Sequence, residues 1–127
     1  LRSYREARPA GAPAARIAAE RVIVPPDSAS DVSRRRYAGF AASRHARTLA
    51  PQGERRTLFS QDIVGSAEEI IEQLIADPVL QQTDELRLEL PYEFSAEEYR
   101  QIITDFATLI APELGWQAQR TPLTRIA

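Results

Sequence analysis

Arginine is the residue type in this chain most able to form a binding site. Arg34, Arg35 and Arg36 are consecutive, and Arg55 and Arg56 form a second group further along the chain. A guanidinium group donates paired hydrogen bonds that match the geometry of phosphate and carboxylate groups. These arginines are therefore candidates for binding an anionic group. The competing interpretation is an Arg-rich helix that faces water, because runs of charge usually do so.

Few other side chains could act as nucleophiles, general bases or metal ligands. His45 is the only histidine and cysteine is absent, so the chain alone offers no histidine relay, thiolate nucleophile or cysteine-bound metal. Ser66 and Ser95 each stand three residues before a glutamate, a spacing that explains them as helix caps rather than nucleophiles. We accordingly predict no catalytic residue and no metal site within the chain.

Charged residues alternate with leucine over residues 86–90. Alternate side chains of a strand point to opposite faces of its sheet. If the leucines pack against covering helices, Arg87 and Glu89 point to the opposite face of the sheet. Should that sheet belong to a closed barrel, this face is the interior, where the two charged side chains would be buried and matched to partners from other strands. We predict a structural ion pair. A catalytic role for Glu89 is the alternative, because barrel active sites lie at the carboxyl ends of strands.

Prolines and glycines divide the first half of the chain. We expect the end of a helix over residues 1–8, and the β-branched end of residues 16–24 predicts a strand. Ser28 and Asp31 resemble a capping box, so we expect a helix over residues 28–49. Its apolar stripe is thin and predicts a helix that is only loosely attached to the body.

Two capping boxes divide the second half. Ser66 with Glu69 predicts the start of one helix, and Ser95 with Glu98 predicts the start of another that carries a wide apolar stripe. Between them, the alternating residues 86–90 predict a strand. Both helices are therefore expected to pack one face against a sheet.

Length, composition and charge limit the classes of function. The 127 residues suffice for one domain, and they contain neither an apolar run that would span a membrane nor a secretory signal, so we expect a cytoplasmic protein. Residues 1–56 hold 12 Arg against 5 acidic residues, whereas residues 57–127 hold 4 Arg against 13. No nucleic-acid-binding motif accompanies the basic half, so we do not expect a nucleic-acid partner.

The expected elements follow the order of parallel βα units: a strand, a long connecting segment, a helix, a second strand and a second helix. Two strands flanked by helices leave sheet edges unpaired, and a complete (β/α)8 barrel needs about 250 residues. The chain also starts with Leu1 rather than with methionine. We therefore expect a parallel α/β fold that forms only part of a larger one.

Three motifs follow one another in the second half. Residues 63–74 include Val-Gly-Ser-Ala-Glu-Glu, residues 83–91 end in Leu-Arg-Leu-Glu-Leu-Pro, and residues 112–116 are Pro-Glu-Leu-Gly-Trp. In this order they resemble the closing segment of luciferase-like flavin-dependent monooxygenases, in which a similar helix start leads to the last barrel strand and the C-terminal helix. The likeness covers nearly the whole chain in outline and implies that residues 1–127 are the C-terminal part of such a domain. The fold that it implies is α/β, with the C-terminal βα units of a TIM-like (β/α)8 barrel, incomplete in this chain.

The resemblance implies an enzyme that uses reduced FMN, or a reduced deazaflavin in some branches; the FMN branch uses oxygen to oxidise a small organic substrate. Residues 25–62 would be an Arg-rich insertion or lid-like segment that carries its guanidinium groups to a flavin phosphate or an anionic substrate. The family's other flavin contacts come from earlier strands, so the chain is not catalytically complete alone. The implied partners are flavin, substrate, and the missing barrel portion or a second copy in a homodimer.

A non-catalytic protein is the alternative class. A small α/β protein could dimerise through an open sheet edge or bind an anionic partner with its basic half. Whether the native product extends upstream of Leu1 distinguishes the two classes, because a product that starts there lacks most of a flavin site.

Overall fold

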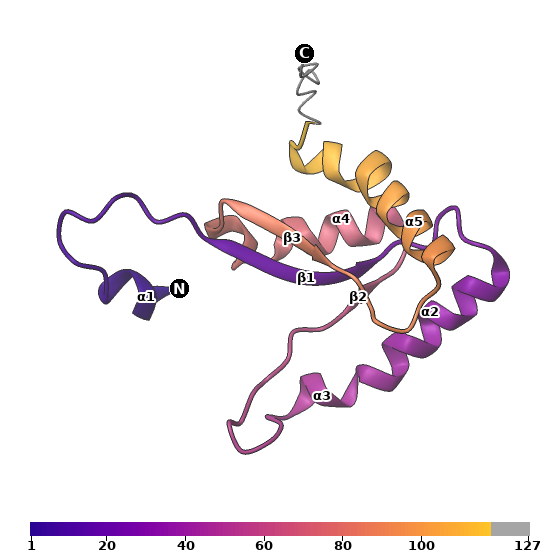
Figure 1. Ribbon diagram of the computed structural model, residues 1–127, viewed down its shortest axis with the longest axis horizontal. Helices are drawn as coiled ribbons and strands as arrows, with labels where there is room; N and C mark the ends of the chain where they lie inside the picture. Colours follow the sequence, from indigo (N-terminus) through magenta and orange to yellow (C-terminus); the bar gives the residue numbers. More distant parts are fainter. Residues whose placement is uncertain (118–127) are drawn as a thin grey trace, which may run out of the picture.

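A computed structural model describes residues 1–117 (Figure 1). Its centre is a parallel sheet in the order β2-β1-β3, formed by β1 (Ala18–Val24), β2 (Ile63–Val64) and β3 (Glu85–Glu89). β1 pairs with β3 along five residue pairs, whereas it pairs with β2 only at Ile23 and Val24. The α/β class and the parallel arrangement are confirmed. The described residues form an open sheet and not a barrel.

Helices follow each of the three strands, and one short helix precedes the first strand and lies away from the sheet (Figure 1). They are α1 (Arg2–Glu6), α2 (Asp31–Arg44), α3 (Ala46–Leu49), α4 (Ala67–Ala76) and α5 (Ala96–Asp105), with the 3-10 turn η1 (Leu80–Gln82), the π-helical turn η2 (Phe106–Ile110) and the 3-10 turn η3 (Ala111–Leu114). The last two turns continue α5. No helix in residues 1–117 is both long enough and apolar enough to cross a membrane.

Both predicted capping boxes are present. At α4 the Ser66 hydroxyl accepts from the backbone N–H of Glu69, and the Glu69 carboxylate accepts from the N–H of Ser66 at 2.8 Å. Gly65 makes room for this return, because a Cβ at that position would lie 2.8 Å from the Glu69 carboxylate. Ser95 and Glu98 repeat the arrangement at α5. These starts were predictable because a capping box depends only on residues three positions apart.

Two predictions about the first half were wrong in detail. The helix expected over residues 28–49 starts later, with Ser30 as its cap, and divides at His45 into α2 and α3. Ser28 instead hydrogen-bonds Asp105, a contact between residues distant in sequence that no local pattern indicates. The strand β2 was not predicted, because two residues are too few to show an alternating pattern.

The core has two parts, one on each face of β1. On one face, Ile23 packs with α4, with the end of the α5 helix and with Leu86 and Leu88 of β3. On the other, Val22 and Val24 lie beneath side chains of α2 and α5 at the carboxyl end of the sheet. The members of this second part are Val22, Val24, Tyr37, Phe40, Phe94 and Ile102.

The attachment of α2 is stronger than predicted. Tyr37 and Phe40 are buried, and both rings contact Phe94, with centroids 4.8 Å and 5.4 Å away. The apolar stripe is thin, since Val32 is exposed, but two aromatic side chains bury enough surface to hold the helix. The prediction of a loosely attached helix was therefore wrong for α2.

The alternation of β3 was predicted correctly, but the burial of its charged side chains was not. Leu86 and Leu88 pack against the core, and Arg87 and Glu89 point to the other face. There they are exposed, because no described element covers that part of the sheet. Arg87 pairs with Glu85 at 2.8 Å and with Glu20 of the neighbouring strand at 3.7 Å. Arg87 thus has a partner on the neighbouring strand, but the pair is exposed, and among residues 1–117 Glu89 forms no ion pair.

Candidate functional site

The loop after β1 lies where ligands usually bind in parallel α/β sheets, beyond the carboxyl ends of the strands. Two side chains hold it in place. The carboxylate of Asp27 accepts from the backbone N–H of Ala67 at the start of α4, at 3.1 Å and 3.2 Å. The N–H and hydroxyl of Ser28 donate to Asp105 at the end of α5, at 2.8 Å and 2.6 Å. The loop is therefore fixed to both helices.

A buried hydrogen-bond network extends from this loop to α2. The amide of Gln101 donates to Asp105 at 2.7 Å and to the carbonyl of Pro25 at 2.9 Å. The carbonyl oxygen of Gln101 accepts from the Tyr37 hydroxyl at 2.7 Å. Asp105 and Tyr37 are almost completely buried. Such a satisfied network orients α2, α5 and the loop after β1 relative to one another, because each unpaired buried group would be costly.

Tyr37 is a hydrogen-bond donor in this network. Burial, with a smaller contribution from the Glu98 carboxylate, raises the pKa of the Tyr37 hydroxyl to about 12. Its proton is thus retained throughout the physiological range. The group positions Gln101 and does not act as a base.

Glu98 and Arg36 form the ion pair that joins α2 to α5. Arg36 donates to both oxygens of Glu98, at 2.9 Å and 3.1 Å, and to the carbonyl of Glu93 at 2.9 Å. Burial works to raise the pKa of Glu98, but hydrogen bonds from Ser95 and Ser33 and the charge of Arg36 outweigh it and lower the pKa. Glu98 is therefore an ionised acceptor at neutral pH.

These groups surround a cleft of about 360 Å³ between the start of α2 and the start of α5. We call it the carboxyl-end cleft; it is lined by Ser28, Ala29, Ser30, Ser33, Arg36, Tyr37, Ser95, Glu97, Glu98 and Gln101. Hydroxyl, amide and carboxylate groups dominate the lining. Such a surface can recognise polar groups of a ligand by hydrogen bonds.

Two of the five predicted arginines are engaged in hydrogen bonds within the chain. Arg34 donates to the carbonyls of Asp27 and Ala29, at 2.7 Å and 3.0 Å, and Arg36 is paired as described above. Arg35 is exposed on α2. Only Arg36 of these three lines the carboxyl-end cleft.

The other two predicted arginines are placed elsewhere. Arg55 and Arg56 are exposed in a turn closed by backbone hydrogen bonds between Gln52 and Thr57. This turn lies beyond α3, and about 12 Å of helix separates Arg36 from the far end of α2. The two groups of arginines do not converge on one point, and their role in anion binding stays a prediction.

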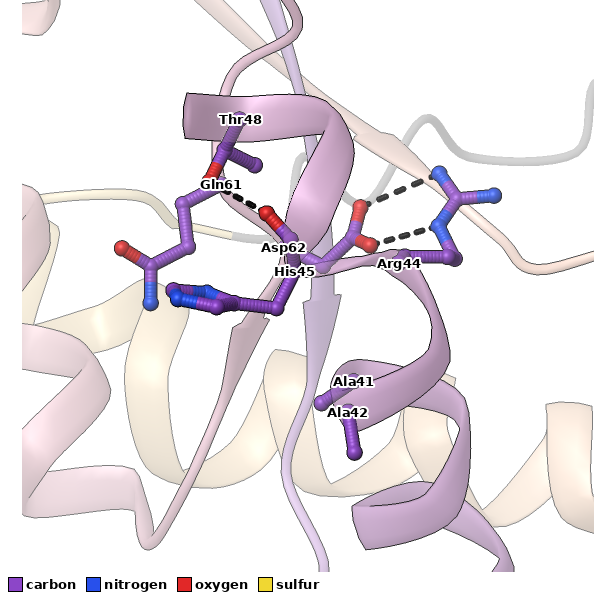
Figure 2. A pocket seen from close by; sticks show the side chains of 7 residues that line it. All are labelled: Ala41, Ala42, Arg44, His45, Thr48, Gln61 and Asp62. Carbon is purple, nitrogen blue, oxygen red and sulfur yellow. Dashed lines mark hydrogen bonds and ion pairs between the residues drawn. The ribbon is translucent and has the colours of Figure 1, made fainter. Parts of the chain in front are cut away.

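A second cleft, of about 220 Å³, lies where α2 ends and β2 begins (Figure 2). Arg44 donates to the two carboxylate oxygens of Asp62 at 2.5 Å and 3.1 Å, and its guanidinium lies 4.7 Å from the centre of the Phe40 ring. His45 and Gln61 flank the cleft, and Figure 2 shows their side chains on the side away from the ion pair. The sequence drew attention to His45 but not to Asp62.

Within residues 1–117, no group of three or more potential ligands is placed to hold a metal ion.

From the sequence alone, Asp105, Gln101 and Asp62 were not identified as site residues. The available signal was weak: Asp105 and Gln101 are polar residues four positions apart beside the apolar stripe of α5, and nothing local indicates their partners.

Comparison of the chain with models of protein families, with curated proteins and with solved structures finds no match. Functional inference therefore depends on the residues and their geometry.

Proposed function

We propose that this chain is the C-terminal part of a luciferase-like flavin-dependent monooxygenase and supplies the last two strands of its barrel. The observation that carries the proposal is the pairing of β1 with β3. The two strands lie side by side, parallel and in register from Ala18 opposite Glu85 to Val22 opposite Glu89. Adjacent strands of a (β/α)8 barrel are related in this way, with a helix between them in the chain. Here α4 precedes β3 and covers the leucine face.

The uncovered part of the sheet supports the same proposal. Glu20, Arg87 and Glu89 share the face opposite the leucines and are exposed in the chain alone. In a closed barrel that face lines the interior, where charged side chains find partners from other strands. β2 occupies only the end of the other edge of β1, at Ile23 and Val24, which leaves the rest of that edge for a preceding strand.

The described residues contribute only part of a flavin site. Arg34 and Arg36 are engaged within the chain, and Arg55 and Arg56 are distant from them, so these four arginines do not meet at one point within residues 1–117. The flavin would supply the oxygen chemistry. This chain would supply the carboxyl-end cleft, which orients polar groups at the mouth of the barrel, and the Arg-rich segment that covers the mouth.

The test is a titration of the native gene product that contains this chain with FMN, followed by flavin fluorescence. We expect the complete product to bind FMN and the 127-residue chain alone not to bind it. Replacing the exposed Arg35, Arg55 and Arg56 by Gln should weaken binding about tenfold if even one of them reaches the phosphate. Arg100→Gln, at an exposed position on α5, is the matched control. A complete product that binds neither FMN nor a deazaflavin would overturn the proposal.

The non-catalytic alternative has one specific observation in its favour. The outer edge of β3 is unpaired in residues 1–117, and two clefts of about 470 Å³ and 560 Å³ border it. Leu86 and Leu114 line both clefts, and Trp116 is 53% exposed in one of them. A second copy would cover this edge. Sedimentation equilibrium of the chain decides the point, because a monomer at all accessible concentrations excludes the dimer.

A further inference from the structure

Residues 45–61, which we call the strap, form a self-contained excursion between α2 and β2. Within residues 1–117, the hydrogen bonds of these residues stay inside the strap or return to Ala42 of α2. Arg47 lies over the Phe59 ring at 4.3 Å, which joins the two limbs of the excursion. None of its residues is buried. The strap therefore has internal order but little packing against the rest of the chain.

One ion pair closes the base of the strap. Arg44 immediately precedes the strap and Asp62 immediately follows it, and their side chains form the two-fold hydrogen-bonded pair of Figure 2. The Asp62 side chain is only 7% exposed and that of Arg44 is 24% exposed. Partial burial makes this pair less screened by solvent than a surface ion pair. It is the principal tie between the two ends of the excursion.

The element before the strap is fixed much more firmly. α2 is joined to α5 by the Arg36–Glu98 pair, by the Tyr37–Gln101 hydrogen bond and by the aromatic contacts of Phe94. The helix is interrupted at His45, immediately after α2 and immediately before α3. Loss of the ion pair would leave the strap free to turn at this interruption while α2 keeps its place.

We propose that the strap opens and closes as one unit about His45, with the Arg44–Asp62 pair as its clasp. Opening exposes the cleft of Figure 2 and moves Arg55 and Arg56 relative to the body, whereas Arg34, Arg35 and Arg36 stay fixed on α2. The inference assigns the moving part of the lid in the proposed function to residues 45–61. It does not depend on flavin, so it can fail or hold independently of the proposed function.

Distances between spin labels test the clasp, and labelling is site-specific because these 127 residues contain no cysteine. One pair of labels joins the strap to α5 through Glu54→Cys and Arg100→Cys. The second joins α2 to α5 through Arg35→Cys and Arg100→Cys. In the Asp62→Asn protein we expect the strap–α5 distance distribution to broaden and shift, and the α2–α5 distribution to stay unchanged.

The Arg21–Asp77 pair supplies a matched control, because it is also partly buried, with N and O 2.9 Å apart, and lies outside the strap. Asp77→Asn should leave both distributions unchanged. The exchanged pair Arg44→Asp with Asp62→Arg should restore the narrow strap–α5 distribution, which guards against an effect of misfolding. An unchanged strap–α5 distribution in Asp62→Asn, or a joint change of both distributions, overturns the proposal.

Discussion

Two parts of the Arg-rich segment, residues 25–44 and the strap, differ sharply in how the body holds them. Both are rich in Arg and Ala. The first part places Tyr37 and Phe40 in the core and makes polar ties to α5 through Ser28 and Arg36, whereas the strap has no buried residue and one clasp at its base. Anchoring thus depends on a few side chains with buried partners and not on the average character of a segment.

The difference also separates two uses of arginine. Within residues 25–44, Arg34 and Arg36 bind carbonyl and carboxylate groups of the chain itself. In the strap, Arg55 and Arg56 face solvent. An arginine bound within its own fold stabilises that fold, while an exposed arginine on a movable part is available to a ligand. The following predictions test this contrast, beginning with the largest effect.

Removal of an aromatic ring should affect the two parts very differently. Phe94 contacts both Tyr37 and Phe40 and is buried, so Phe94→Ala should lower the free energy of unfolding by about 3–5 kcal/mol. Phe59→Ala, in the strap, should cost about 1 kcal/mol or less. Urea unfolding measures both. Similar losses would show that the strap is part of the core and would contradict the contrast.

The buried carboxylate of Asp105 should matter more than an exposed carboxylate in the strap. Asp105→Ala leaves the N–H of Ser28 and the amide of Gln101 without their acceptor, which should cost about 1–3 kcal/mol. Glu54→Ala is the control, because Glu54 is exposed in the strap. Thermal unfolding compares the two variants. A loss no larger than that of the control would mean that water replaces the carboxylate at little cost.

Acid should weaken the tie between α2 and α5. Glu98 has a pKa below its ordinary value of 4.5 in the folded protein, so the unfolded chain takes up the proton first as the pH falls. Its stabilising contribution is complete above about pH 4.5 and is lost as the pH falls through the lower folded pKa. Stability measured from pH 7 to pH 3 should therefore fall less steeply in Glu98→Gln than in the unaltered protein. Parallel curves would contradict this assignment.

The smallest effect is expected at the tip of the strap. Arg56 has a φ of 50°, in the left-handed region that costs a non-glycine residue about 1 kcal/mol. Arg56→Gly should favour the closed turn and slow hydrogen exchange of the Thr57 amide, by up to about fivefold. The global free energy of unfolding should change by less than about 0.5 kcal/mol. Arg55→Gly is the control and should not slow this exchange.

Local patterns in the sequence predicted much of the second half of the fold. The starts of α4 and α5 follow from Ser-x-x-Glu spacings, and the alternating leucines predict β3. The first half was less predictable, because His45 interrupts a helix without any proline or glycine to indicate it. The site residues were least predictable of all. Asp105 and Ser28 are far apart in sequence, and only the packing of α5 beside the loop after β1 brings them together.

The sequence by itself determined the parallel βα class, the helix caps and the division of β3 into an apolar and a charged face. These depend on interactions between residues a few positions apart. Tertiary structure alone decided which arginines are bound within the fold and which are exposed. It also decided that Arg44 and Asp62 meet at the base of the strap. The physical reason is that an ion pair or a buried network needs partners from distant parts of the chain, and packing of the helices on the sheet sets their distances.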